Sequence, residues 1–218
     1  MFELPSPSKT SDKIIDVQNV YATKMITLSQ IADDIITYQS RYTTNLNKDL
    51  VMNELYKVLA NPEVYDTIMT GALIDTVAST PDLADRLPVH FKTLIHKLQV
   101  DYPGYGIDEQ LGISIAKQYG SISEASFGDL DNNKFGVAKN LDTAKGNTIL
   151  DDITLGIISA VSGKIARKYD TDVITSKQVT SDYALIVNHK IVAKGDNAED
   201  IASLNRSNYH NLGIVRKF

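Results

Sequence analysis

The chain of 218 residues is 43% hydrophobic, which is enough to bury a core, and its net charge of -5 argues against a nucleic-acid backbone as the main partner. It contains no cysteine, which excludes disulfides, thiolate metal sites and a cysteine nucleophile. Chemistry must therefore rest on oxygen and imidazole groups, and a phosphate ester would need a cation between itself and this acidic protein.

The first 26 residues predict a polar tail and lead-in, because the opening segment lacks the apolar run of a secretory signal. Thr27 and Gln30 form a capping box ahead of the first helix, and Asn61 with Pro62 caps the third. Helices with an apolar stripe are predicted over 28–42, 47–60, 62–79, 87–98 and 107–119. Residues 121–147 show no sustained period, so we expect an ordered loop there.

A sixth helix is predicted from 150 to 169, opened by a second capping box from Thr148 to Asp151. The remaining residues predict a β-hairpin, a short helix and a third strand, over 183–187, 190–193, 196–205 and 212–216. We therefore expect a mainly α fold, a multi-helix orthogonal bundle with a small C-terminal β-hairpin/α appendage. The expected division is 1–26, a helical domain over 27–169, and an appendage over 170–218 docked on that domain.

Acidic residues at the starts of two predicted helices are candidates for a metal centre. Asp108 and Glu109 open one helix, where acids also favour the helix dipole. Asp151 and Asp152 open the other, where Asp151 also fits the capping box. Asp152 has no such role, and we expect it to be partly buried.

Asp75 and Asp131 extend this set of carboxylates. Asp75 lies at the edge of an apolar helix face, and burying an ionised carboxylate is costly unless it is paired or binds a metal. A salt bridge or hydrogen bond to a neighbouring helix would serve Asp75 equally well. Lys134, three residues after Asp131, is a candidate for binding phosphate, with a surface lysine as the alternative. Oxygen ligands from several helices suit Mg²⁺, whose bound water could attack phosphorus.

Three motifs in order resemble those of the phosphatidylglycerophosphatase A family: GIDEQLG at 106–112, DNNKFG at 131–136 and LDDITLGIISA at 150–160. TGALID at 70–75 and YGSI at 119–122 resemble the soluble Gram-positive branch, and the resemblance spans residues 27–168. It implies Mg²⁺-dependent removal of the terminal phosphate of phosphatidylglycerophosphate in phospholipid metabolism. It also implies metal ligands at Asp75, Asp108, Glu109, Asp151 and Asp152, and catalytic roles for Asp108, Glu109, Asp131 and Asp152. From its place in the loop, Lys134 is the expected substrate-binding residue.

Two other functions remain open: hydrolysis of a soluble phosphorylated metabolite, and a non-catalytic metal-binding or interaction module. We expect a cytoplasmic protein with at most peripheral contact with the inner face of the membrane, no nucleic-acid partner, and an oligomeric state left open, a homo-oligomer included. Tyr102, Tyr105, Phe127 and Phe135 are candidates for an exposed apolar surface beside the site, or for core residues.

Overall fold

A computed structural model describes residues 10–43, 46–102, 105–142, 147–176, 183–187, 190–195, 202, 205 and 214–217. These residues form a mainly α fold, as predicted. The helices in chain order are α1 (Thr10–Ala22), α2 (Leu28–Gln39), α3 (Lys48–Leu59), α4 (Pro62–Ser79), α5 (Pro81–Arg86), the 3₁₀ helix η1 (Val89–Phe91), α6 (Lys92–Gln99), α7 (Ile107–Lys117), α8 (Ser121–Asn132), α9 (Gly136–Asp142) and α10 (Leu150–Ser176). The strands that follow are β1 (Tyr183–Val187), β2 (Lys190–Gly195) and β3 (Ile214–Lys217).

Local capping signals in the sequence set the starts of α2 and α4 as predicted. The Thr27 hydroxyl accepts a hydrogen bond from the backbone N–H of Gln30 at 3.2 Å, and the Gln30 side chain accepts one from the Thr27 N–H at 2.8 Å. Asn61 accepts from the N–H of Glu63 at 3.0 Å, with proline in the first turn of α4. These contacts lie within three residues of each other, so the sequence alone could reveal them.

The N-terminal segment differs from its prediction as a polar tail and lead-in, because residues 10–22 form α1. Val17 and Tyr21 of this helix are fully buried. The Tyr21 hydroxyl lies 2.9 Å from the Thr154 hydroxyl of α10, which itself donates to the Leu150 carbonyl. Tyr21 is therefore the donor of the bond that ties α1 to a helix far along the chain.

The ordered loop predicted over 121–147 is also wrong, because it contains α8 and α9. The inward face of α8 includes the small polar residues Ser123 and Ser126, which are buried. Their presence interrupts the apolar period by which a helix is recognised in a sequence. The start of α9 is capped from a distance, since Asp34 of α2 accepts the N–H of Val137 at 2.7 Å.

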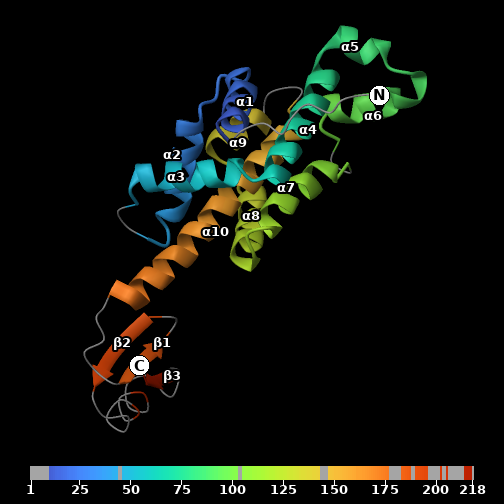
Figure 1. The fold of residues 1–218 in the computed structure, drawn as a ribbon. Coiled ribbons are helices and arrows are strands. Elements are labelled where there is room, and N and C mark those ends of the chain that lie inside the picture. The colour runs from blue at the N-terminus through green and yellow to red at the C-terminus, as the bar shows by residue number, and fades with distance from the viewer. Residues whose placement is uncertain are drawn as a thin grey trace, which may run out of the picture. The chain divides into compact units, whose positions relative to one another are not determined.

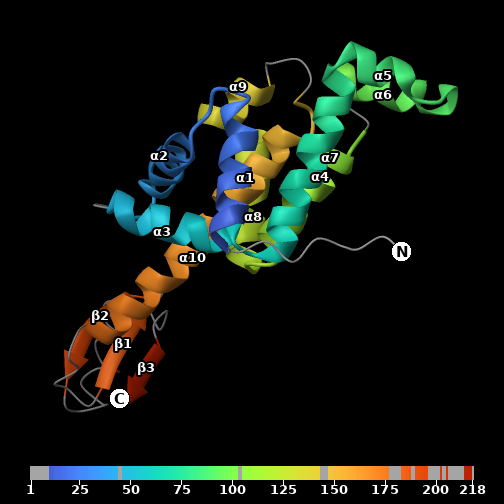
Figure 2. The ribbon, with the colours of Figure 1, turned by 45° about the horizontal axis from the view of Figure 1, so that its top comes forward.

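Helix α10 is the central element of the helical unit and runs among the other helices (Figures 1 and 2). Its residues 150–163 are all buried. Neighbouring helices approach it at glycines: a Cβ on Gly71 of α4 would meet the side chains of Ile149 and Ile153. A Cβ on Gly112 of α7 would meet the backbone of Asp152, and one on Gly156 would meet the backbone of Gly112. Because neither Gly112 nor Gly156 has a side chain, the backbones of α7 and α10 touch beside Asp152.

The Gly156→Ala variant is expected to lower the free energy of unfolding by about 2 kcal/mol, because the added methyl group would run into helix backbone that cannot rotate away. Gly128→Ala is the matched control, since Gly128 lies within α8 with nothing inside 4 Å of an added Cβ. That control should gain roughly 0.5–1 kcal/mol from the higher helix propensity of alanine. Urea denaturation measures the free energy of unfolding of both variants. Equal values would contradict the close contact between Gly156 and the backbone of Gly112.

The chain divides into two compact units, Met1–Ile165 and Ala166–Phe218. In the second unit β1 is the central strand of an antiparallel sheet of order β2-β1-β3, which confirms the predicted hairpin and third strand. Val187 pairs with Lys190, and the register shifts between Leu185 and Ile186. The short helix predicted over 196–205 falls mostly outside the described residues. The predicted boundaries and docking of the appendage stay predictions.

None of the helices in the described part of the chain combines the length and apolar character needed to cross a membrane.

Candidate functional site

Lys134 lies in the short connection between α8 and α9, where its ammonium group is surrounded by carboxylates. Its Nζ atom is 2.7 Å from Asp151 Oδ2 and 3.0 Å from Asp152 Oδ1, at the start of α10. It is also 3.5 Å from Asp142 Oδ1 and 4.0 Å from Asp131 Oδ1. We refer to Lys134, Asp131, Asp142, Asp151 and Asp152 as the Lys134 cluster.

Burial controls the electrostatics of the Lys134 cluster. The side chains of Asp151 and Asp152 are 4% and 3% exposed, against 22% for Lys134. Burial raises the pKa of Asp151 to about 6 although Lys134 lowers it, and burial together with the charge of Asp151 raises the pKa of Asp152 to about 7. Burial would lower the pKa of Lys134, but Asp151 and Asp152 outweigh it, so the lysine stays charged. The cluster thus has an excess of negative charge over one fixed positive charge.

Two buried carboxylate oxygens of this cluster are incompletely satisfied. Oδ1 of Asp151 and Oδ1 of Asp152 accept no hydrogen bond within the described residues. Oδ1 of Asp152 has the ion pair with Lys134, whereas the ammonium bonds Asp151 through its other oxygen. Buried polar atoms are normally hydrogen-bonded, so Oδ1 of Asp151, which also lacks an ion pair, makes this cluster a candidate ligand site.

Asp75 holds the start of α10 rather than joining the Lys134 cluster directly. Its carboxylate accepts the N–H of Ile149 at 3.1 Å and that of Leu150 at 2.9 Å, from α4 across to α10. Burial raises the pKa of Asp75 to about 7, although these two bonds lower it. The hydrogen bond to a neighbouring helix, left open as an alternative by the sequence, is therefore present.

The capping box predicted from Thr148 to Asp151 is replaced by this contact. The hydroxyl of Thr148 donates to the carbonyl of Leu98 at 2.6 Å, and Asp151 accepts from Lys134. The helix start is where the sequence places it, but a residue of α4 supplies the cap. Asp151 is thereby released from a capping role.

The remaining predicted residues lie at the start of α7. Asp108 is partly buried, which raises its pKa, and the charge of Lys134 acts in the opposite direction, so the two groups are close enough to interact. Oδ1 of Asp108 accepts the N–H of Glu109 at 3.0 Å. Glu109 is exposed. The structure thus brings Asp131, Asp151 and Asp152 together around Lys134, with Asp108 near them, and Glu109 points to solvent.

Sequence reasoning missed Asp142, the last residue of α9. It belongs to the segment predicted as a loop, so no helical spacing linked it to Lys134. Recognising that Val137, Ala138 and Leu141 form one apolar face would have revealed α9 and shown where Asp142 lies.

Whether this arrangement fits a metal ion depends on the place that Lys134 takes. Among the described residues, no set of three or more acidic or imidazole side chains is placed to hold a metal ion. The ammonium of Lys134 lies between Asp151 and Asp152, where an ion held by these two carboxylates would have to bind. The donors themselves are the carboxylate oxygens that Mg²⁺ prefers, and two of them are buried without a hydrogen bond. The residues therefore fit the ion chemically, provided that the lysine moves.

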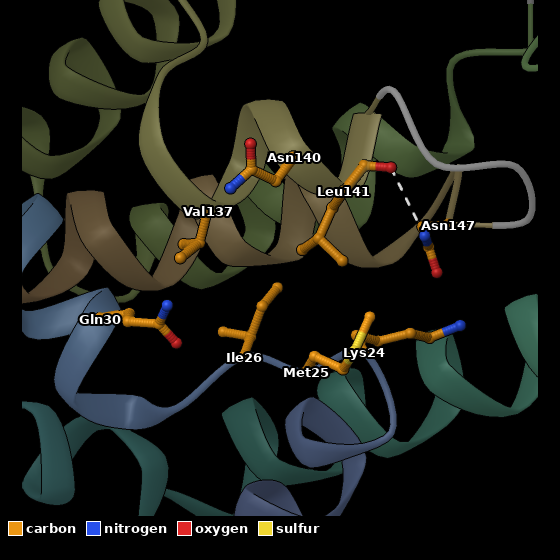
Figure 3. A pocket seen from close by; sticks show the side chains of 8 residues that line it. All are labelled: Lys24, Met25, Ile26, Gln30, Val137, Asn140, Leu141 and Asn147. Carbon is orange, nitrogen blue, oxygen red and sulfur yellow. Dashed lines mark hydrogen bonds between the residues drawn. The ribbon is translucent and has the colours of Figure 1, made fainter.

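A pocket of about 400 Å³ lies between the α1–α2 turn and α9. Figure 3 shows Ile26 and Gln30 on one side of it and Val137 and Leu141 on the other. Two of its polar residues serve the fold: Gln30 completes the capping box, and Asn147 donates to the Leu141 carbonyl at 3.5 Å.

Comparison with known proteins identifies the family. The uncharacterized protein YpjQ of Bacillus subtilis is 31% identical over 163 residues, covering 73% of this chain and 88% of the relative. This chain belongs to the family of YpjQ. The uncharacterized protein YutG of Bacillus subtilis is 33% identical, over 66% of this chain and 84% of its own. No family model matches the chain.

Solved structures agree with this assignment. The crystal structure of YpjQ from Bacillus subtilis, described under the family-model name DUF64, has a TM-score of 0.67 at 30% identity and covers 75% of this chain and 99% of its own. The low temperature requirement C protein of Listeria monocytogenes has a TM-score of 0.65 at 27% identity, over 75% of this chain and 99% of its own. The helical fold is therefore shared by these relatives.

These relatives overturn the resemblance drawn from the three motifs. The family is that of YpjQ and YutG, and the assignment to phosphatidylglycerophosphatase A was wrong. The inferred hydrolysis of phosphatidylglycerophosphate, with its place in lipid metabolism, loses its support with that assignment. Phe127, expected among the apolar residues beside the site, is 3% exposed and belongs to the core. Short acidic motifs were weaker evidence than similarity over most of the chain.

Proposed function

We propose that this protein is a Mg²⁺-dependent hydrolase of small, water-soluble phosphoric monoesters. The observation that carries the proposal is the convergence of Asp131, Asp142, Asp151 and Asp152 on one cationic group at the start of a buried helix. Oxygen donors from three helices, held by a rigid core, are suited to a hard divalent cation. A single basic group within the same cluster supplies a contact for the phosphate anion.

Bound there, Mg²⁺ would supply a water molecule of lowered pKa and neutralise charge on the phosphoryl oxygens. Asp151 and Asp152 would hold the ion, because they are the most buried donors and are fixed on α10. Lys134 would bind a phosphoryl oxygen as a point charge. In the reaction the water oxygen bonds to phosphorus, the ester P–O bond breaks, and the alcohol leaves with a proton.

The test is phosphate release from a panel of soluble monoesters, including p-nitrophenyl phosphate and glycerol phosphate, with Mg²⁺ and with EDTA. We expect release that requires Mg²⁺ and is restored when the ion is added back after chelation. A rate indistinguishable from buffer on the whole panel, in a protein shown to bind Mg²⁺, would contradict the hydrolase.

A non-catalytic role is favoured by one specific observation, the short contact of Lys134 with Asp151. An ion-paired cluster of this kind can simply fix the α8–α9 connection to α10. That role predicts no binding of Mg²⁺ or Mn²⁺, which isothermal titration calorimetry measures independently of any substrate.

A further inference from the structure

We infer that Lys134 is a resident counter-cation that a divalent ion must displace, so that metal binding and release of the lysine side chain are one event. The inference rests on the metal dependence in the proposed function and adds a means of controlling it. Lys134 then has two positions, one among the carboxylates without metal and one outside them with metal.

The first argument is the number of donors and acceptors. An ammonium group has three N–H donors, whereas four carboxylates lie within 4.0 Å of it. The ammonium donates to Oδ2 of Asp151 and lies 3.0 Å from Oδ1 of Asp152, whereas the buried Oδ1 of Asp151 has no hydrogen-bond partner among the described residues. Lysine therefore neutralises the cluster incompletely, and an ion with two charges and more coordination positions would do so better.

The second argument is steric. The ammonium contacts both Asp151 and Asp152, so a metal bound between these two carboxylates would coincide with it or lie beside it at strongly repulsive range. Both cations cannot occupy the cluster together.

The third argument is that Lys134 has a route out of the cluster. It lies outside the helices, between Asn132 and Gly136, and its side chain is 22% exposed, so it has a route to solvent. A lysine has a flexible four-carbon stem and a strongly hydrated head. Once displaced, it stays tethered beside the metal, where it can meet an anion bound to that metal.

The experiment compares Mg²⁺ affinity by isothermal titration calorimetry, and Mn²⁺ affinity by electron paramagnetic resonance, in three variants. Lys134→Met removes the charge and keeps the apolar stem, so affinity should rise by about tenfold or more. Lys134→Arg keeps a competing charge and should stay near the natural protein. Lys117→Met is the matched control and should change nothing, because Lys117 is exposed on α7 and pairs with Glu124, which lies outside the cluster.

Unchanged or weaker affinity in Lys134→Met would overturn the displacement. Should that variant fail to fold, Lys134→Gln carries the same expectation, because it keeps a hydrogen-bond donor without the charge. Tighter binding in Lys134→Met with no hydrolysis by the natural protein would sink the hydrolase and leave the displacement intact. Mg²⁺-dependent hydrolysis by the natural protein, with the same Mg²⁺ affinity in Lys134→Met, would support the hydrolase and overturn the displacement.

Discussion

Replacing Asp152 by Asn is expected to weaken Mg²⁺ binding by about 100-fold or more while leaving the metal-free protein as stable as before, or more stable, at neutral pH. The variant keeps the shape of the side chain and removes one of two adjacent buried carboxylates. Asp151 keeps its 2.7 Å bond to Lys134, so no buried charge is left without its counter-ion. Relief of repulsion should contribute roughly 1–3 kcal/mol at pH 8.

The pH dependence provides a second measurement for the same variant. Burial raises the pKa of Asp152 to about 7 from its ordinary value of 3.8, so the folded state holds a proton that the unfolded state releases. This contribution to stability is fully present below about pH 4 and is lost as the pH rises through about 7, a change of about 4 kcal/mol. Asp152→Asn should flatten that decline, as measured by thermal unfolding between about pH 4 and 8.

A structural ion pair predicts the opposite outcome. Breaking a buried pair typically costs roughly 3–5 kcal/mol, so a large drop in the melting temperature of the metal-free variant, with Mg²⁺ affinity unchanged, would favour that role. Asp129→Asn is the matched control, because Asp129 is 40% exposed in a surface pair with Arg41. It should change stability by less than about 0.5 kcal/mol.

Replacing Asp75 by Ala is expected to destabilise the helical unit by about 4 kcal/mol. The change leaves the buried N–H groups of Ile149 and Leu150 without their acceptor, at roughly 1–3 kcal/mol for each. Asp75→Asn keeps one acceptor oxygen and should cost only about 1 kcal/mol. Urea denaturation of the two metal-free variants measures the difference.

The variants Asp75→Ala and Asp75→Asn also distinguish a capping role of Asp75 from a metal-binding role. If Ala and Asn cost the same, the cap does not hold α10 and the assignment fails. If Asn keeps the stability but loses Mg²⁺ affinity, the predicted role of Asp75 as a ligand is supported in addition to capping.

The sequence predictions succeeded where a feature depends on residues close together in the chain, and failed where it depends on contacts between distant residues. The starts of α2 and α4 depend on residues three positions apart or less, and both predicted starts hold, whereas α2 ends at Gln39 rather than at the predicted residue 42. The burial of Asp75 and Asp152, each 1–2% exposed, was also foreseen, because each lies among apolar residues of its own helix. The helices α1 and α8 were missed because their apolar or small residues can be recognised as buried only once α10 is seen to pack against them.

The family assignment failed for a related reason. Three short motifs located the carboxylates, but a few acidic residues at helix starts occur in unrelated proteins for capping and dipole reasons. Similarity over 163 residues to YpjQ is a far stronger criterion than any of these motifs.

By itself, the sequence determined a helical core, the acidic residues at the starts of α7 and α10, and the absence of thiol chemistry. These features follow from composition and from spacing within single helices. Only the tertiary structure decided that Lys134 is the common partner of Asp131, Asp142, Asp151 and Asp152, and that Asp75 caps α10. Such contacts join residues up to 75 positions apart through the glycine-lined packing of α4 and α7 on α10, and no local pattern encodes that distance.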